Sequence, residues 1–320
     1  MATDPARLAV AATAVRKAYG DHVVLDGIDL DIPAGSVFAL LGPNGAGKTT
    51  VVKILSTLIS ADAGEVRVAG HDVVRDPDAV RAAIGVTGQF SAVDGFLTGE
   101  ENLMLMADLN RLPRGERRQR AADLLARFDL VDAARKPAAM YSGGMRRRLD
   151  LAMTLVGRPR VIFLDEPTTG LDPRSRRTMW EIVRRLVTEE GVTVFLTTQY
   201  LEEADQLADR IAVLHRGQLV AEGSPEELKR QAGGGHITLR FADPRGYDHA
   251  ARMLDVVSRN DETCTLRIPG QGDVRSLRAL LDRLDRASLT VHELQVHTPD
   301  LDDVFFALTG NPVTEQEPAR

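Results

Sequence analysis

Residues 42–49 read Gly-Pro-Asn-Gly-Ala-Gly-Lys-Thr and match the pattern G-x-x-x-x-G-K-[ST]. An apolar run at 36–41 precedes this stretch and an amphipathic stripe at 51–59 follows it, so it joins an expected strand to an expected helix. Glycines here let backbone N–H groups turn toward a phosphate, and the N-terminal end of the helix adds a favourable dipole. The stretch therefore predicts a loop that binds the phosphates of a nucleotide.

Two side chains of this loop carry the expected chemistry. Lys48 is expected to reach the β- and γ-phosphates, and the Thr49 hydroxyl is expected to bind Mg²⁺. The alternative, a glycine-rich turn with a solvated lysine, does not explain the strand and the helix on either side. The candidate nucleotide ligands are Gly42, Pro43, Asn44, Gly45, Ala46, Gly47, Lys48, Thr49 and Thr50.

Two carboxylates, Asp165 and Glu166, end the apolar run 161–164. In phosphate-loop NTPases an Asp at such a strand end holds Mg²⁺, which assigns Asp165 as a metal ligand. Glu166 is then placed to polarise an attacking water as a general base, a role that contributes about 10²–10⁴-fold to a rate. The alternative is a surface pair of carboxylates that caps the next turn.

The composition narrows the class of protein. The chain has 320 residues, 40 Lys+Arg against 46 Asp+Glu, and a single cysteine, Cys264. A net charge of −6 argues against binding to nucleic acid. No apolar run approaches the ~18 residues of a membrane helix, and we expect no signal peptide at the N-terminus. One unpaired cysteine fits a reducing compartment, so we expect a cytoplasmic protein.

Strand and helix patterns alternate over the first two thirds of the chain. Strands are expected at 8–15, 27–32, 36–41, 161–164, 192–198 and 211–214, and the strands 64–68 and 84–86 are expected to form a pair. A long helix is expected between Asp172 as N-cap and Gly191 as its end. This order predicts an α/β fold with a mainly parallel sheet that is covered by helices.

The expected domains follow from changes in composition. Residues 1–232 form the first domain, with a helical subdomain at about 92–158, and 233–235 form a glycine linker. Residues 236–310 form a small α+β domain, with alternating runs at 236–241 and 264–268 and helices at 247–257, 274–287 and 301–308. The polar tail 311–320 is expected to be disordered.

The segment Tyr141-Ser142-Gly143-Gly144-Met145 resembles the signature loop of ATP-binding-cassette (ABC) ATPases, which is usually Leu-Ser-Gly-Gly-Gln. The resemblance implies a phosphate-loop NTPase cassette with a mainly parallel core, an antiparallel β-subdomain and a helical subdomain. In this family Ser142, Gly143 and Gly144 would close over the γ-phosphate held by a second subunit, so that a dimer sandwiches two ATP molecules. Ser142 is also expected to cap the following helix. The arginines at 146–148 form either a solvated face or an interface contact.

The same resemblance assigns three further positions. Tyr19 would stack on adenine, Gln89 would contact Mg²⁺ and the attacking water, and Asp172 would cross the dimer interface. Each has a simpler alternative: a half-buried strand tyrosine, a polar loop residue and a helix cap. Most ABC ATPases place a His where this chain has Gln199. A Gln amide can donate a hydrogen bond to a phosphate but takes up no proton, which leaves Glu166 as the expected base and Gln199 as a candidate catalytic contact.

Four longer segments, at 141–148, 165–175, 197–205 and 299–310, resemble the daunorubicin/doxorubicin-resistance (DrrA-like) exporter ATPases. The resemblance implies ATP and Mg²⁺ as cofactors, a homodimer, and separately encoded permease subunits at the cytoplasmic face of the membrane, where the chain would be peripheral. It implies ATP-driven export of a hydrophobic drug or antibiotic of the anthracycline kind. Export of a lipid or another natural product, or a regulatory ABC ATPase that does not transport, remain as alternatives.

Overall fold

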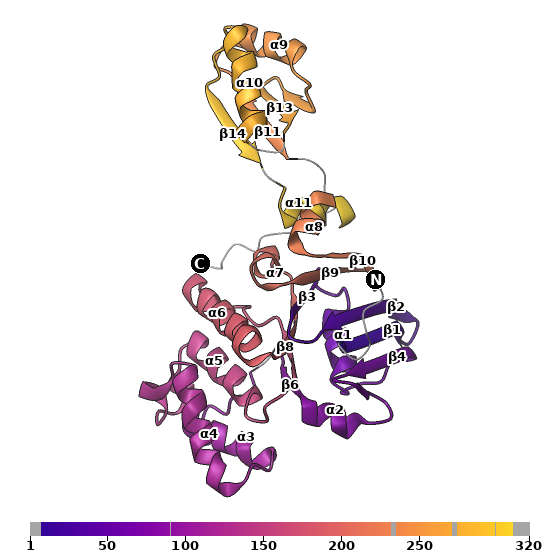
Figure 1. The fold of residues 1–320 in the computed structure, drawn as a ribbon, viewed down its shortest axis with the longest axis vertical. Helices are drawn as coiled ribbons and strands as arrows, with labels where there is room; N and C mark the ends of the chain where they lie inside the picture. The colour runs from indigo at the N-terminus through magenta and orange to yellow at the C-terminus, as the bar shows by residue number, and fades with distance from the viewer. Residues whose placement is uncertain (1–7, 90, 232–234, 271–273, 298, 310–320) are drawn as a thin grey trace. The chain divides into compact units, whose positions relative to one another are not determined.

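The computed structural model describes residues 8–89, 91–231, 235–270, 274–297 and 299–309 (Figure 1). The chain divides into two compact units, Met1–Pro225 and Glu226–Arg320. The predicted glycine linker at 233–235 lies almost wholly outside the described residues, as does the predicted disordered tail at 311–320. In the described part of the chain, no helix is both long enough and apolar enough to span a membrane.

A six-stranded sheet forms the centre of the first unit. Its strands, in spatial order, are β10 (Gln218–Gly223), β9 (Arg210–His215), β3 (Val37–Leu41), β8 (Thr193–Thr198), β7 (Val161–Asp165) and β6 (Ile84–Thr87). The strands from β9 to β6 run parallel, and β10 is antiparallel to β9. Every residue of β3, β7 and β8 is buried, which explains why these strands read as continuous apolar runs. The predicted mainly parallel sheet is confirmed.

A second, antiparallel sheet belongs to the same unit. Its strands, in order, are β2 (His22–Pro33), β1 (Leu8–Tyr19), β4 (Ala63–Val68) and β5 (His71–Asp72). The predicted pairing of 64–68 with 84–86 is wrong, because β4 pairs with β1 whereas β6 pairs with β7 in the central sheet. The helix α2 (Pro77–Ala83) separates the two strands. Two short apolar runs close in sequence do not specify each other as partners.

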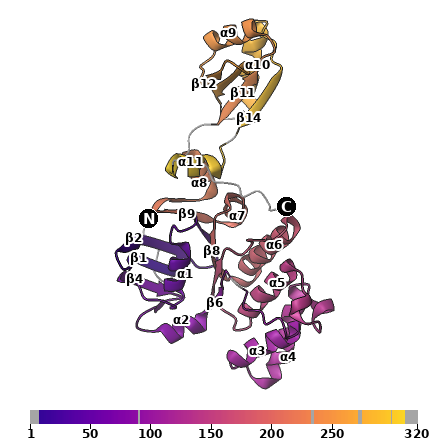
Figure 2. The same cartoon turned by 180° about the vertical axis from the view of Figure 1, so that it is seen from behind.

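Helices cover the central sheet and form the predicted helical region. They are α1 (Lys48–Leu55), α3 (Gly99–Leu109), α4 (Arg114–Arg127), α5 (Gly143–Thr154), α6 (Pro173–Glu190) and α7 (Leu201–Leu207). The helices α3, α4 and α5 gather on one side of the central sheet and the antiparallel sheet lies on the other, as both views show (Figures 1 and 2). Asp172 caps α6 and Gly191 ends it with φ 66°, as predicted.

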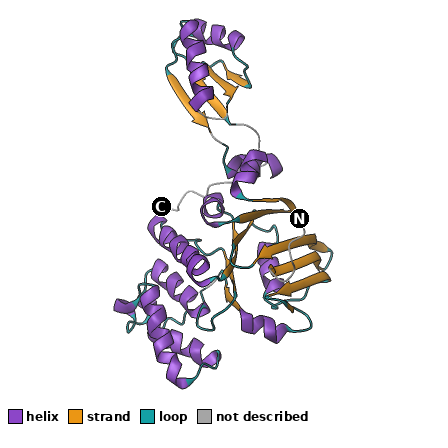
Figure 3. Cartoon of the chain, in the orientation of Figure 1, coloured by secondary structure: helices purple, strands orange, loops and turns teal. Residues whose placement is uncertain are grey.

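The second unit is a small α+β fold, as predicted, which Figure 3 shows as a sheet beside helices. Its sheet has the antiparallel order β12 (Ser258–Asn260), β13 (Thr265–Pro269), β11 (His236–Arg240) and β14 (Glu293–His297). The helices of the unit are α8 (Pro225–Gln231, at its start), α9 (Pro244–Met253), α10 (Val274–Arg286) and α11 (Leu301–Thr309). Alternating residues of the sheet, such as Ile237, Leu239 and Leu266, form its core with Tyr247 and Leu284.

Candidate active site

The candidate site lies where three parallel strands end. The phosphate loop follows β3, Asp165 is the last residue of β7, and Gln199 follows β8. Because β3, β8 and β7 are neighbours and parallel, their carboxyl ends meet at one edge of the sheet. Open α/β sheets bind ligands at this edge. The topology thus brings together residues that are more than 100 positions apart in sequence.

Lys48 is the buried cation of the site, with a side chain only 5 % exposed. Its Nζ donates hydrogen bonds to the carbonyls of Gly42 (2.8 Å) and Pro43 (3.2 Å), and lies 3.4 Å from Glu166 Oε1. Burial lowers the pKa of the ammonium, while Glu166 and Asp165 raise it in part. An anionic phosphate would compensate this buried charge further.

A chain of oxygen atoms links the phosphate loop to β7 and β8. Thr49 Oγ1 donates to Asp165 Oδ2 at 2.9 Å, and Thr197 Oγ1 donates to Asp165 Oδ1 at 2.5 Å. A hydroxyl and a carboxylate at one point are the donors that Mg²⁺ prefers. Thr197 lies two residues before Gln199, but its sequence context alone does not mark it as a partner of Asp165.

Glu166 has an unusual backbone. Its φ is 50°, a left-handed conformation that is costly for a residue with a side chain and that concentrates at functional sites. The Glu166 N–H donates to the Thr197 carbonyl at 3.1 Å and also lies 3.1 Å from Thr197 Oγ1, so β8 holds the turn in place. The sharp turn directs the carboxylate toward Lys48 rather than along the strand.

The phosphate loop requires glycine at its tightest points. Gly47, the N-cap of α1, has φ 110°, and a Cβ there would lie 2.8 Å from Leu25 Cδ2 and 3.0 Å from the Val24 carbonyl. A Cβ on Gly42 would lie 2.4 Å from the Leu214 carbonyl. The loop therefore packs so closely on β2 and β9 that no larger residue fits at either position.

Arg147 is a residue whose position the sequence did not reveal. Its side chain is 11 % exposed and turns inward from α5, so a solvated face is the wrong interpretation for this arginine. Its guanidinium donates to the carbonyls of Pro167 (2.8 Å), Gly88 (3.0 Å), Asp165 (3.3 Å) and Glu166 (3.4 Å). One side chain thus joins the signature helix to the turn after β7 and to the residue before Gln89.

A buried carboxylate accompanies this arginine. Asp150 lies one turn further along α5, and its Oδ2 is 3.2 Å from Arg147 Nη1. Burial raises the pKa of the Asp150 carboxyl, although a hydrogen bond from the Ala92 N–H and the charge of Arg147 lower it in part. Burial likewise lowers the pKa of the Arg147 guanidinium. The pair is therefore desolvated, and removal of either partner leaves a buried charge.

The signature loop begins α5. Ser142 caps this helix, as predicted, and its Oγ accepts a hydrogen bond from the Met145 N–H at 3.2 Å. A Cβ on Gly144 would lie 2.4 Å from Ser175 Oγ, so glycine allows α5 to approach the start of α6. Ser175 Oγ in turn donates to Asp172 Oδ2 at 2.6 Å. Ser142 and Gly143 are exposed, which leaves their polar groups accessible.

Three further predicted site residues are Tyr19, Gln89 and Gln199. Tyr19 is 52 % exposed and its ring lies 5.5 Å from Lys17 Nζ. Gln89 is exposed in the loop after β6, and Gln199 is half-buried directly after β8. In the described part of the chain, none of these three side chains forms a hydrogen bond with the loop. Their assigned roles remain predictions.

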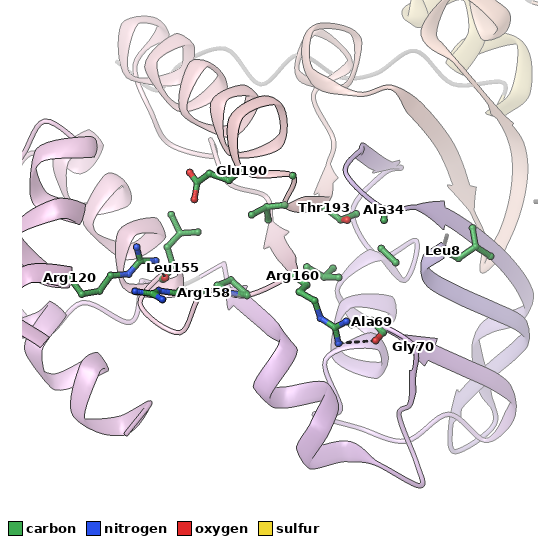
Figure 4. Close-up of a pocket in the computed structure, with 15 residues that line it drawn as sticks. Leu8, Ala34, Ala69, Gly70, Arg120, Leu155, Arg158, Arg160, Glu190 and Thr193 are labelled. Atoms are coloured by element: carbon green, nitrogen blue, oxygen red, sulfur yellow. Dashed lines mark hydrogen bonds between the residues drawn. The ribbon is translucent and has the colours of Figure 1, made fainter. Parts of the chain in front are cut away.

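A cavity of about 680 Å³ lies at the opposite edge of the central sheet, where β7 and β8 begin (Figure 4). Arg120, Arg158, Arg160 and Glu190 contribute its charged side chains. Arg160 donates to the Ala69 carbonyl at 2.9 Å, the dashed line of the figure. The phosphate loop follows the carboxyl end of β3, so this cavity is separate from the candidate nucleotide site.

Two protein-family models match the chain. The model described as "ABC transporter" matches residues 25–169, and the model described as "ATP-binding protein DrrA1-3-like, C-terminal domain" matches residues 223–309. The first match includes the phosphate loop, the signature loop and the turn after β7. The second match includes the small α+β fold.

Curated proteins and solved structures agree with these models. The chain is 48 % identical to the daunorubicin resistance ATP-binding protein DrrA3 of Streptomyces coeruleorubidus, over 97 % of this chain and 99 % of the relative. It is 46 % identical to the daunorubicin/doxorubicin resistance ATP-binding protein DrrA of Streptomyces peucetius, over 99 % and 96 %.

A solved relative carries nucleotide. The dimeric post-hydrolysis structure of the ATP-binding cassette MJ0796, bound to ADP and Pi, covers 67 % of this chain and 98 % of its own, with 28 % identity and a TM-score of 0.61. With the Lys48, Asp165 and Glu166 geometry, these similarities establish that the chain is an ABC-type ATPase and belongs to the DrrA family of ABC transporter ATP-binding proteins.

Proposed function

We propose that this chain hydrolyses ATP to drive export of a hydrophobic drug through separate membrane subunits. Lys48 and the backbone of residues 42–50 bind the phosphates, and Tyr19 stacks on adenine. The observation that supports this most directly is the convergence of Lys48, Glu166 and the Thr49–Asp165 pair at one sheet edge. These groups would supply a phosphate ligand, a metal position and a base within a few ångströms of one another.

Thr49, Asp165 and Gln89 would hold Mg²⁺. The Thr49 hydroxyl oxygen and a carboxylate oxygen of Asp165 are 2.9 Å apart, and both can bind a metal ion. Gln89 would contribute an amide oxygen from the loop after β6. When bound, the ion would neutralise charge that develops on the β- and γ-phosphates. Thr197 orients Asp165 by its hydrogen bond at 2.5 Å, so that one carboxylate oxygen stays directed toward Thr49.

Glu166 acts as the general base. Its Oε1 lies beside Lys48 Nζ, at 3.4 Å. Binding of phosphate gives the ammonium a stronger partner and releases the carboxylate to accept a proton from water. Gln199 donates a hydrogen bond to the γ-phosphate but exchanges no proton, because an amide does not titrate near neutral pH.

A homodimer completes the site. The exposed Ser142 and Gly143 and the amide groups at the start of α5 would bind the γ-phosphate of a second subunit, since a helix N-terminus favours an anion. Asp172 lies beside this helix through Ser175 and Gly144 and would face the same interface. The dimeric cassette structure among the similar proteins supports this arrangement.

The names of the similar proteins indicate the class of molecule that would be transported. Daunorubicin and doxorubicin resistance proteins match the chain over nearly its whole length, including residues 223–309. We infer an anthracycline-like cargo, carried by permease subunits that this chain would energise from the cytoplasmic face of the membrane. The chain is also 36 % identical to the Nod factor export ATP-binding protein I of Ralstonia nicotianae, which makes export of another natural product the second candidate.

The test is drug efflux in a host that lacks its own exporters. Cells would express the chain with the membrane protein that co-purifies with it, and daunorubicin accumulation would be followed by its fluorescence. We expect accumulation to fall only when both proteins are present, and to recover with Glu166→Gln. The matched control is Glu181→Gln on the exposed face of α6. The proposal of drug export fails if both variants reduce accumulation equally or if no membrane protein co-purifies.

A further inference from the structure

Two histidines face each other at one end of the sheet in the second unit. His236 begins β11 and His297 ends β14, and the two residues are direct partners in the antiparallel register. Their ring centroids are 4.5 Å apart and their planes make an angle of 37°. Side chains at directly opposed positions of an antiparallel pair project to the same face. The strand pairing therefore holds two imidazoles on one side of the sheet.

Two carboxylates lie beside one of these imidazoles, that of His297. Asp300 and Asp303 are at the start of α11, shortly after β14. His297 Nε2 lies 2.7 Å from Asp303 Oδ2, and ligand atoms of His297, Asp300 and Asp303 all lie within 4.8 Å of one another. The His297 and Asp303 side chains are 36 % and 40 % exposed, so an ion can reach them from solvent.

Helix capping explains only part of this arrangement. The Asp303 N–H donates to Asp300 Oδ1 at 3.0 Å, and the Asp300 N–H donates to Asp303 Oδ2 at 3.1 Å, a reciprocal cap for α11. Neither bond needs an imidazole. His236 in particular has no ion pair among the described residues. The capping bonds therefore leave the placement of the two imidazoles unexplained.

We propose that His236, His297, Asp300 and Asp303 form a binding site for Zn²⁺. Two nitrogen and two carboxylate ligands match the preference of zinc, while Mg²⁺ and Ca²⁺ favour oxygen ligands alone. Tetrahedral bonds of about 2.0–2.1 Å require donor atoms roughly 3.3 Å apart. The ion would replace the hydrogen bond between His297 and Asp303, and side-chain rotations would bring the remaining donors closer. The bound ion would join β11 and β14 to the first turn of α11.

The test is zinc titration of the full-length, untagged protein after treatment with a chelator. Calorimetry with Zn²⁺ in the presence of excess Mg²⁺ should give one equivalent per chain. Co²⁺ should give the intense visible absorption of a tetrahedral site. His236→Gln and His297→Gln should each weaken Zn²⁺ binding by more than about tenfold. The matched controls are His249→Gln and His292→Gln, two exposed histidines of the same unit, which should bind as the wild type does.

Folding of the variants is checked separately. Metal-free circular dichroism and melting curves of each variant should match those of the metal-free wild type. Asp303→Asn adds an independent measurement, because an amide oxygen still accepts the capping hydrogen bond while the metal loses a charged ligand. The proposal is overturned if the wild type binds no Zn²⁺, if the paired histidine variants bind it unchanged, or if the control variants lose it equally.

Discussion

The ammonium of Lys48 lies 3.4 Å from Glu166 Oε1, so the proposed phosphate-binding cation and the proposed base form an ion pair. Each group is directed by its own element: Lys48 by the first turn of α1, and Glu166 by the left-handed turn after β7. Both side chains are nearly buried. A bound phosphate would compete with Glu166 for Lys48, so phosphate binding and proton abstraction from water would be coupled through this pair.

Glu166→Gln should separate binding from hydrolysis. Glutamine cannot accept a proton, so we expect the turnover number to fall by at least about 10²-fold while ATP still binds. Phosphate release measures the first quantity and equilibrium titration with a fluorescent ATP analogue measures the second. The exposed Glu181→Gln on α6 serves as the control and should leave both unchanged. Unchanged turnover in Glu166→Gln would remove this residue from the role of base.

Lys48→Ala, in contrast, should weaken the binding of ATP itself. A hydrogen bond to a charged group contributes about 1.5–3 kcal/mol, so we expect ATP affinity to fall roughly 10- to 150-fold. Glu166 would also lose its partner. Lys53, exposed in the last turn of the same helix, provides Lys53→Ala as a control with the same chemical change. Equal affinity loss in the two variants would point to damage of α1 rather than to loss of a phosphate contact.

Arg147→Gln should lower turnover more than ATP affinity. Arg147 holds the carbonyls of Asp165, Glu166 and Pro167, so its loss frees the turn that places the base. Misplacement of a catalytic group by about 1 Å costs around 10²-fold in rate. The neighbouring Arg146→Gln is the control, since the Arg146 side chain lies only partly buried on the same helix. Arg147→Lys keeps the positive charge but not the planar guanidinium group, so it should recover little of the turnover number.

Loss of Arg147 is also expected to affect the stability of the fold. Asp150 would be left buried without its cation, which by itself destabilises the fold. Melting curves for Arg147→Gln and for Asp150→Asn with Arg147→Gln distinguish the two effects. If the double variant regains stability but not turnover, Arg147 positions the site. Full recovery of turnover together with stability would assign it a structural role alone.

Local sequence patterns were sufficient for much of the molecule. The phosphate loop was predicted because glycine spacing and a flanking strand and helix act within about twenty residues. The caps at Ser142 and Asp172 were predicted because a helix N-cap depends on its own side chain. These features require no knowledge of distant residues.

Features that depend on tertiary packing were not predicted. Three adjacent arginines look alike in sequence, yet only the fold determines that Arg147 turns toward Asp165. The partner of β4 depends on the crossover through α2, which separates it from β6. The pairing of His236 with His297 joins residues that are distant in sequence through a strand register. In each case the informative contact is non-local, and a single sequence does not record it.

Glu203 offers a prediction about pH and stability. This residue of α7 is fully buried, and its Oε1 accepts a hydrogen bond from Trp180 Nε1 at 3.2 Å. Burial raises the pKa of its carboxyl above the ordinary value. At low pH both the folded and the unfolded chain keep this proton. As the pH rises through the ordinary pKa, the unfolded chain releases it first, so the unfolding free energy falls by about 1.4 kcal/mol per pH unit until the folded pKa is reached.

Glu203→Gln should remove that dependence, because the amide is neutral in both states and still accepts from Trp180. We expect the variant to lose less stability than the wild type as the pH rises above the ordinary pKa of a glutamate, measured as the midpoint of urea unfolding. The exposed Glu181→Gln should retain the wild-type dependence. A Glu203→Gln variant with the wild-type pH slope would mean that Glu203 is ionised in the folded chain, held by a cation such as the nearby Arg176.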